Sequence, residues 1–304
     1  MHVLLTGGTG FIGTALIEAL LAKGSAVTIL SRKPQGDRPG CRFIQSLDEI
    51  AATEQIDAVI NLAGASLAAR RWTAAYKREI VASRMDTTRQ VLDLLARLQR
   101  PPAVLLSASA IGYYGHHGDE YLTESSTVTP GFAQTLCGDW ESLAMQAQQL
   151  GVRVCLLRLG VVLDSGGGAL VEMAKSFRFG VASWLGSGQQ WLSWVHRQDV
   201  IRSIQFLLGR DDLQGPFNIT SPEPVTGRDF ARVLQAHHRT FIRAGVPGPV
   251  MRLLVGEMAG ELLLHGQRVL PQRLQAAGFD FTYPDIESAL TAIYATYPPR
   301  RSQI

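Results

Sequence analysis

Three glycines near the start of the chain have the types and spacing of a phosphate-binding turn. In MHVLLTGGTGFIGTALIEALLAKG, Gly7, Gly10 and Gly13 lie between a short apolar strand and a segment with apolar residues at helical spacing. The first glycine permits a tight turn, the second lets the backbone approach a pyrophosphate, and the third lets helix and strand pack closely. The N–H groups and the dipole at the start of the helix, where Phe11 and Ile12 stand, favour an anion. The pattern therefore predicts a dinucleotide site.

The end of the second expected strand indicates which dinucleotide binds. In SAVTILSRKP the strand is followed by Ser31, Arg32 and Lys33, with no acidic residue. An acidic residue at this point usually binds the ribose 2′-hydroxyl of NAD, whereas a guanidinium or ammonium suits the 2′-phosphate of NADP. A solvated basic turn is the alternative. We expect NADP(H), held through these three residues.

Strands and helices alternate along the rest of the first half. A third strand, DAVINLAGAS, ends in Asn61, Ala63 and Gly64, whose small size leaves room for an adenine ring or ribose. AVLLSASAIGYYG, with Ser107, gives a fourth strand and VRVCLLRLGVVL a fifth. We expect Ser107 and, on the intervening helix, Arg84 to contact the cofactor. The alternation predicts an α/β fold with a doubly wound parallel sheet covered on both faces.

Composition limits the remaining possibilities. The chain has 304 residues, 46% hydrophobic and 18% charged, with a net charge of +3 and 29 basic residues in no long run, so we expect a globular protein with no nucleic-acid partner. The three cysteines lack metal-ligand spacing, which favours a reducing compartment and no metal site. No uninterrupted apolar stretch reaches about 18 residues, so we expect no membrane span and a cytoplasmic location.

Several motifs together resemble a known superfamily. TGGTGFIG, NLAGAS, SASAIGYYG, LRLGVVL and SWVHRQDVIRSIQFLL resemble, in order, the extended short-chain dehydrogenases/reductases, which include nucleotide-sugar epimerases and dehydratases. RRWTAAYKREIVASRMDTT and the tail GEMAGELLLHGQRVLPQRLQAAGFDFTYPDIESAL look like its atypical epimerase-like, cell-division-inhibitor-related branch. The resemblance covers nearly the whole chain. It implies a Rossmann-type fold and NADP(H) binding, and it implies no particular substrate.

The resemblance also implies catalytic residues, and this chain lacks two of them. Members of the superfamily use a Ser or Thr at the end of the fourth strand, matched by Ser109, and then a Tyr with a Lys four positions after it. With Glu141 as the anchor, those two positions fall near Ala133 and Cys137. In such enzymes the Tyr is the general acid or base, while the Lys lowers its pKa and holds the nicotinamide ribose. Neither replacement can do this.

Two interpretations of the missing pair stay open. In the first, the acid has moved to Tyr114, or less favourably Tyr113, in a loop that leaves the carboxyl end of the fourth strand, where open α/β sheets bind their ligands. The protein would then be an oxidoreductase for a small carbonyl or sugar-nucleotide-like substrate. In the second, it is a catalytically weak NADP(H)-binding regulator or partner-binding protein, and the tyrosines are packing residues.

The predicted domains interleave along the chain. Residues 1–160, with a return at about 194–220, should form the cofactor domain. A smaller substrate-binding lobe should comprise about 161–193 and 221–304. The sequence leaves the oligomeric state open.

The tail carries its own turn and helix signals. It predicts a helix starting near Pro271, a stop at Gly278, a short strand at 280–283 and a last helix from Asp285 whose apolar face docks on the core.

Overall fold

The chain forms two compact units that interleave in sequence. The computed structural model describes residues 1–296, without the side chains at positions 252, 254, 255, 262 and 263. The first unit comprises Met1–Tyr113, Thr135–Arg158 and Ile201–Phe217, and the second comprises Tyr114–Gln134, Leu159–Val200 and the described chain from Asn218 onward.

The stretch from Tyr114 to Gln134 lies in the second unit, whereas the sequence analysis assigns it to the cofactor domain. Its internal bonds give the reason. The Thr129 amide donates to the Tyr114 carbonyl at 2.8 Å, and the Tyr114 hydroxyl donates to Asn218 at 2.6 Å. Such distant partners cannot be read from the local pattern.

A seven-stranded sheet organises the first unit, with the order β12-β7-β5-β4-β1-β2-β3. β1 pairs in parallel with β2 and β4, β2 with β3, and β4 with β5. The strands are β1 (His2–Thr6), β2 (Ala26–Leu30), β3 (Cys41–Ile44), β4 (Ala58–Asn61), β5 (Val104–Ala110), β7 (Arg153–Leu159) and β12 (Gly215–Ile219). The order reverses beside β1, which creates the switch point where such sheets bind ligands. The predicted α/β, doubly wound Rossmann-type class is confirmed.

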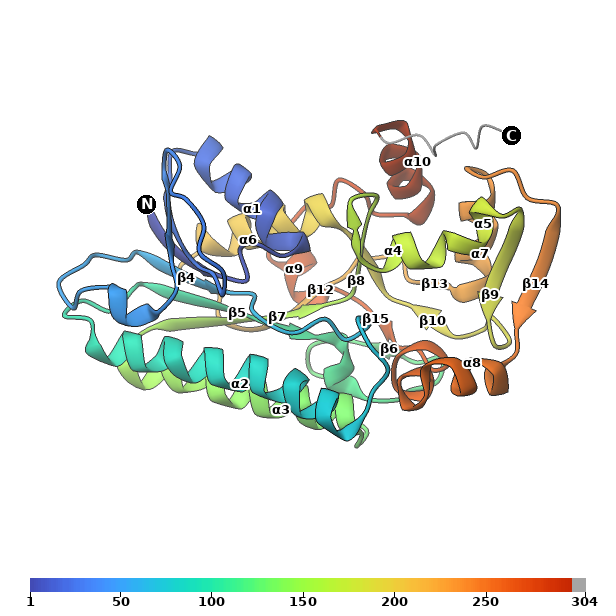
Figure 1. Cartoon of the computed structure of the whole chain (residues 1–304), viewed down its shortest axis with the longest axis horizontal. Coiled ribbons are helices and arrows are strands. Elements are labelled where there is room, and N and C mark those ends of the chain that lie inside the picture. The colour runs from blue at the N-terminus through green and yellow to red at the C-terminus, as the bar shows by residue number, and fades with distance from the viewer. Residues whose placement is uncertain (297–304) are drawn as a thin grey trace. The chain divides into compact units, whose positions relative to one another are not determined.

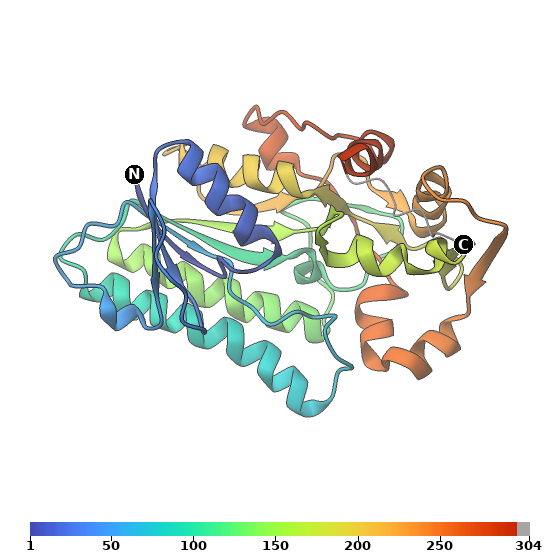
Figure 2. The same cartoon turned by 45° about the horizontal axis from the view of Figure 1, so that its top comes forward.

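Helices cover both faces of this sheet (Figures 1 and 2). α1 (Phe11–Ala22) and α6 (Arg197–Leu208) lie on one face, where the Gln205 amide donates to the Ala19 carbonyl at 3.2 Å. α2 (Ala74–Arg97) and α3 (Phe132–Met145) lie on the other. Short 3₁₀ turns occupy Leu47–Glu49, Ile111–Tyr114 and Gln146–Leu150. In the described part of the chain, no helix combines the length and apolar character that a membrane crossing requires.

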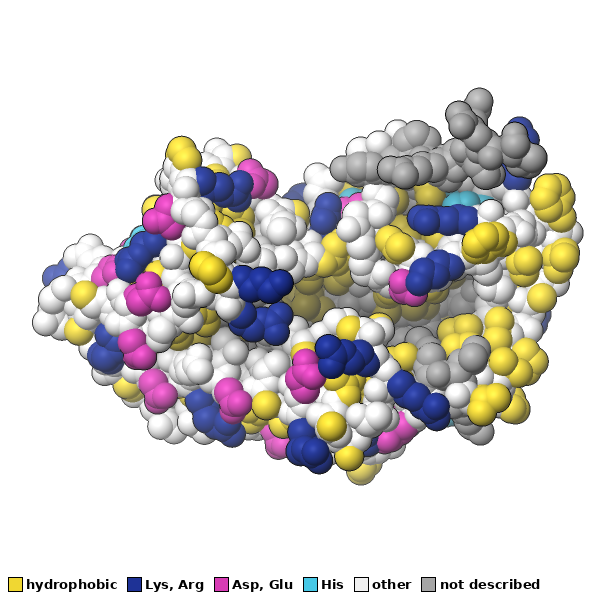
Figure 3. All heavy atoms as spheres, in the orientation of Figure 1, with side chains coloured by type: hydrophobic (Ala, Val, Ile, Leu, Met, Phe, Trp, Pro, Cys, Tyr) yellow, Lys and Arg dark blue, Asp and Glu magenta, His cyan; other side chains and the backbone are white. Residues whose placement is uncertain are grey.

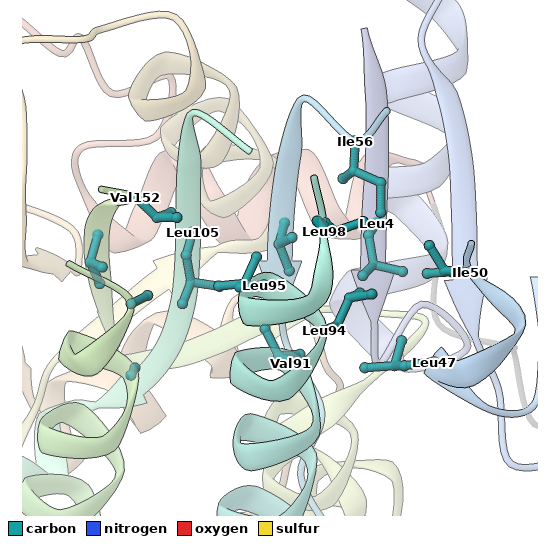
Figure 4. Packing of buried hydrophobic residues seen from close by; sticks show 14 of the residues in the cluster. Leu4, Leu47, Ile50, Ile56, Val91, Leu94, Leu95, Leu98, Leu105 and Val152 are labelled. Carbon is teal, nitrogen blue, oxygen red and sulfur yellow. The ribbon is translucent and has the colours of Figure 1, made fainter. Parts of the chain in front are cut away.

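The core under α2 explains why that helix forms where it does. Its buried apolar residues recur at the spacing of one helical face and point toward the strands. Figure 4 shows Val91, Leu94 and Leu95, with Leu98 directly after the helix, against Leu4 and Leu105. Full burial of each such side chain stabilises the fold by about 1.5–3 kcal/mol. At the other end of α2, the Thr73 hydroxyl caps the helix by accepting the Tyr76 amide at 3.1 Å.

The second unit is built from two-stranded pairs and short helices. The pairs are β6 (Tyr121–Leu122) with β15 (Arg268–Val269), β8 (Val161–Asp164) with β11 (Trp194–His196), β9 (Val181–Leu185) with β14 (Ile242–Val246), and β10 (Trp191–Leu192) with β13 (Val225–Thr226). The helices are α4 (Gly168–Met173), α5 (Lys175–Arg178), α7 (Gly227–Gln235), α8 (Gly248–Val255), the π turn Ala259–Leu263, α9 (Gln272–Ala276) and α10 (Ile286–Thr296).

The expected strand at 280–283 is wrong. The Asp199 carboxylate accepts the amides of Thr282 at 3.0 Å and Tyr283 at 2.9 Å, so a buried side chain takes the bonds that a neighbouring strand would have made. The other signals in the tail hold. Gly278 ends α9 with a φ of 85°, and the Asp285 side chain caps α10.

α10 docks its apolar face on a core shared with α7, as the sequence predicts. The cluster joins Ile286, Leu290 and Ile293 to Phe230 and Leu234.

Hydrophobic side chains gather on the surface of the second unit over β14 and α8 (Figure 3). Phe179 is 86% exposed, Phe241 88%, and Leu253 75%. Exposed apolar patches of this kind are typical of interaction sites.

Candidate functional site

Two positions at the turn between β1 and α1, Gly7 and Gly13, leave no room for a side chain. Gly7 has a φ of 71°, and a Cβ there would lie 2.7 Å from the carbonyl carbon and oxygen of Leu62, just after β4. A Cβ at Gly13 would lie 2.3 Å from the Gly7 carbonyl oxygen. The turn is therefore pressed between the start of α1 and the end of β4. Two of the three predicted glycine roles, the tight turn and the close packing, correspond to this geometry.

The N-terminus of α1 is open to an anion. Gly10 is the N-cap, no side chain caps the helix, and its first turn holds no acidic residue. A Cβ at Gly10 would meet only the Gly7 carbonyl oxygen, at 3.2 Å. Phe11 and Ile12 are half-buried in the first turn. The orientation of the first-turn amides and the helix dipole fit a pyrophosphate here, so the residues present fit a dinucleotide.

Basic side chains stand at the end of β2, next to β1. Ser31 is 5% exposed and its hydroxyl donates to the Lys33 carbonyl at 2.8 Å, which shapes the turn. Arg32 and Lys33 are exposed, and within residues 1–296 neither forms an ion pair. The Asp37 carboxylate, the first one after the strand, accepts the Phe43 amide at 2.7 Å. The strand end thus offers positive charge and no carboxylate.

A buried polar network joins the strand ends of the switch point. Asn61 donates to the hydroxyls of Thr88 at 2.9 Å and Ser107 at 3.3 Å, and accepts that of Thr6 at 2.6 Å. Thr6 in turn accepts the Ala63 amide at 3.2 Å. Asn61 and Ser107 have no exposed surface. The two side chains hold β1, β4, β5 and α2 together, and their direct contact with a cofactor stays a prediction.

Ser109 belongs to a buried charge cluster that the sequence analysis did not recognise. Its hydroxyl donates to the Glu141 carboxylate at 2.6 Å. Arg158 donates one hydrogen bond to each oxygen of that carboxylate, both at 2.8 Å. The side chains of Arg158 and Glu141 are 4% and 7% exposed. The Arg158 guanidinium also lies 3.4 Å from the centre of the Tyr113 ring. A charged residue inside the apolar strand VCLLRLG was the available signal, because such a charge requires a buried partner.

The two predicted acids differ in their surroundings. Tyr113 is partly exposed, whereas Tyr114 has no exposed surface and its hydroxyl donates to Asn218 at 2.6 Å. Tyr114 can reach a substrate only if this bond breaks. Its role as the acid stays a prediction, as does that of Tyr113.

Cys137 occupies α3 where the resemblance places the lysine. The thiol is 4% exposed, and burial, followed by the nearby Glu141, raises its pKa to about 11. It is a neutral group at physiological pH and cannot supply a cation. Ala133 lies four residues earlier on the same helix.

Arg84 brings a guanidinium to this part of the first unit from α2. A Cβ on Gly64, which follows β4, would lie 3.0 Å from its Cζ, so the glycine makes room for it. Arg84 donates to the Ile80 carbonyl at 3.0 Å and lies 5.3 Å from the Trp140 ring centre. Burial lowers its pKa, although the neighbouring Cys137 and Tyr76 oppose the shift. Arg84, Gly64 and Cys137 are thus brought together from three elements.

The fold and the turn define a dinucleotide-binding α/β protein, and comparison with known proteins gives its family. The chain belongs to the NAD dependent epimerase/dehydratase family, whose pattern matches residues 3–220. A domain of unknown function (DUF1731) matches residues 246–293. The resemblance inferred from the motifs is confirmed.

Relatives and solved structures cover nearly the whole chain. An epimerase family protein of Staphylococcus aureus is 38% identical over 296 residues, covering 94% of this chain and 97% of that protein. The crystal structure of the human epimerase family protein SDR39U1 (isoform 2) with NADPH aligns with a TM-score of 0.88 and 33% identity, covering 97% and 99% of the two chains. A nucleoside-diphosphate sugar epimerase from Corynebacterium glutamicum aligns with a TM-score of 0.78 and 30% identity, covering 96% of this chain and 58% of its own.

Proposed function

We propose that the protein is an NADP(H)-dependent oxidoreductase or epimerase that acts on a small carbonyl or sugar-nucleotide-like substrate. The observation that carries the cofactor assignment is the end of β2, where Arg32 and Lys33 are exposed and form no ion pair with the described residues. The first carboxylate after the strand, that of Asp37, accepts the Phe43 amide. The human relative crystallised with NADPH supports the same choice. The substrate class is supported by the relative named as a nucleoside-diphosphate sugar epimerase.

The chain's own residues would share the work around the cofactor. The open N-terminus of α1 would bind the pyrophosphate, and Arg32 and Lys33 the 2′-phosphate. When bound, the nicotinamide supplies hydride transfer. Ser109, fixed by Glu141 and Arg158, would orient the substrate. We assign proton donation to Tyr113, because it keeps accessible surface, and a positioning role to Tyr114.

Cofactor preference tests the first half of this proposal. Arg32→Ala should weaken NADPH binding by about 10- to 100-fold and leave NADH binding unchanged, because one charged hydrogen-bonding group is lost. Titration of nicotinamide fluorescence measures both constants. Arg38→Ala is the matched control, since Arg38 is exposed and pairs with Glu18. Equal affinity of the native protein for the two cofactors would refute the assignment.

Substitution of the tyrosines tests the second half. Against a panel of small carbonyls and sugar nucleotides, Tyr113→Phe should slow NADPH turnover by about 10²-fold or more with unchanged NADPH affinity. Tyr114→Phe should instead lower the free energy of unfolding by about 1 kcal/mol through loss of the Asn218 bond. A Tyr113→Phe protein with native turnover would remove this residue from the acid role.

The second candidate function is a regulator that binds NADP(H) with little turnover. The observation in its favour is the replacement of the usual Tyr and Lys by Ala133 and Cys137. Inactivity across the whole panel, together with a protein partner that binds only in the presence of NADPH, would support this candidate over the enzyme.

A further inference from the structure

Arg84 is a half-buried cation without a carboxylate partner in the described part of the chain. It donates to the Ile80 carbonyl at 3.0 Å and lies 5.3 Å from the centre of the Trp140 ring, and its Cζ lies 3.0 Å from the point where a Cβ of Gly64 would stand. A guanidinium stays charged in proteins, and charges removed from water are normally paired because their desolvation is costly. The desolvation of Arg84 is therefore not offset by a carboxylate of the described chain. We infer that an anion, or a set of oxygen atoms, from a ligand binds this guanidinium.

Arg158, a buried arginine of the first unit, shows the usual arrangement. It has the Glu141 carboxylate, with both oxygens at 2.8 Å. Even the exposed Arg97 donates to two carbonyls, those of Ile50 and Leu47, at 2.6 and 2.8 Å. Among residues 1–296, Arg84 has one carbonyl acceptor for its five N–H donors. We expect the other donors to bind a ligand.

The position of Arg84 in the fold limits which class of ligand it can bind. Gly64 lies just after β4, and Leu62, two residues earlier, touches the glycine turn at Gly7. The guanidinium therefore lies at the carboxyl end of β4, beside the phosphate-binding turn and at the reversal of strand order. The absence of a side chain at Gly64 leaves room for this approach, because an added Cβ would lie 3.0 Å from the Cζ of Arg84 and the guanidinium would have to move by a few tenths of an ångström.

Cys137 is a second indication of where the Arg84 guanidinium lies. Its thiol lies close enough to Arg84 for each to influence the ionisation of the other. Cys137 is also the α3 position at which the resemblance expects a lysine. The cation that α3 lacks is therefore supplied to the same neighbourhood from α2.

We propose that Arg84 takes the place of the missing lysine and binds the ribose and phosphate oxygens at the nicotinamide end of the dinucleotide. This assignment rests on the proposed NADP(H) function. A guanidinium delivered from α2 can donate two parallel hydrogen bonds to adjacent oxygens, which an ammonium cannot. Arg84 is then a cofactor-positioning residue. The glycine at position 64, which leaves room for the guanidinium, is the structural feature that accompanies a cation supplied from α2.

Binding and stability measured together test the proposal. Arg84→Met should weaken NADPH binding by about 10- to 100-fold, the loss expected for a charged hydrogen-bonding group. It should not lower the thermal midpoint of the free protein, because an unpaired buried cation is removed. Arg89→Met is the matched control on the same helix, since Arg89 is exposed and pairs with Asp86. A lowered midpoint with native affinity would show a purely structural arginine and overturn the proposal.

Moving the cation back to α3 gives the sharper test. The double variant Arg84→Met with Cys137→Lys should regain most of the lost NADPH affinity, whereas Cys137→Lys alone should lose affinity because it sets two cations side by side. Arg84→Lys, which keeps the charge in place, should bind NADPH more tightly than Arg84→Met even if the Cys137 variants do not fold. Equal binding by Arg84→Lys and Arg84→Met would overturn the proposal.

The outcomes separate this inference from the function on which it rests. A native protein that binds no NADPH would overturn both. A native protein that binds NADPH with an affinity matched by Arg84→Met would overturn only the role of Arg84.

Discussion

Glu141→Ala should lower the free energy of unfolding by about 3–5 kcal/mol, the range for removing one partner of a buried ion pair. The change removes the carboxylate that accepts two hydrogen bonds from the Arg158 guanidinium, whose side chain is 4% exposed. It also removes the acceptor of the Ser109 hydroxyl, which lies 2.6 Å from Glu141. Urea denaturation followed by circular dichroism measures the loss.

Two further variants show whether the uncompensated charge is the cause. Asp139→Ala, on the same helix but exposed, should change the free energy of unfolding by less than about 0.5 kcal/mol. Glu141→Leu combined with Arg158→Met should cost less than Glu141→Ala alone, because both charges leave together. If the double variant is as unstable as the sum of its single variants, the pair does not act as a unit, and the penalty comes from packing.

The parts of the site that depend on local pattern could be predicted from the sequence. Gly7 and Gly13 sit where the strand, turn and helix signals place them, and the basic end of β2 follows its strand directly. The alternation of strands and helices was sufficient for the class of fold, since parallel strands need crossover helices.

The parts of the site that depend on partners far along the chain could not be predicted from the sequence. The Tyr114 hydroxyl is committed to Asn218, 104 residues later, so the sequence alone gives a loop tyrosine that looks available. The sequence predicts that Arg84 contacts the cofactor, but it does not show that Gly64 and Cys137 lie beside this arginine. The tail shows the same limit, because the Asp199 carboxylate takes the amides of residues 282 and 283 and prevents the expected strand. Each of these features rests on a contact far along the chain, which local periodicity does not encode.

Gly13→Ala should weaken NADPH binding by at least about 10³-fold, or about 4 kcal/mol. Gly13 has no positive φ, so its backbone conformation accepts a side chain and only space forbids one. The added Cβ would lie 2.3 Å from the Gly7 carbonyl oxygen and 2.6 Å from the Gly8 Cα. These are backbone atoms of the glycine turn itself, so they cannot give way unless the turn shifts and its amides leave the positions at which we expect them to bind a pyrophosphate.

The sign of the stability change makes Gly13→Ala a test of geometry and not only of binding. Alanine in place of glycine within a helix ordinarily stabilises it by about 1 kcal/mol, so intrinsic propensity and the clash act in opposite directions. We expect the clash to prevail and the free energy of unfolding to fall by about 1–3 kcal/mol, the usual cost of overpacking. Gly36→Ala is the control, because a Cβ there meets nothing within 4 Å. If Gly13→Ala unfolds at higher urea than the native protein and keeps its NADPH affinity, then α1 does not press on the glycine turn as the structure has it, and the phosphate site must lie elsewhere.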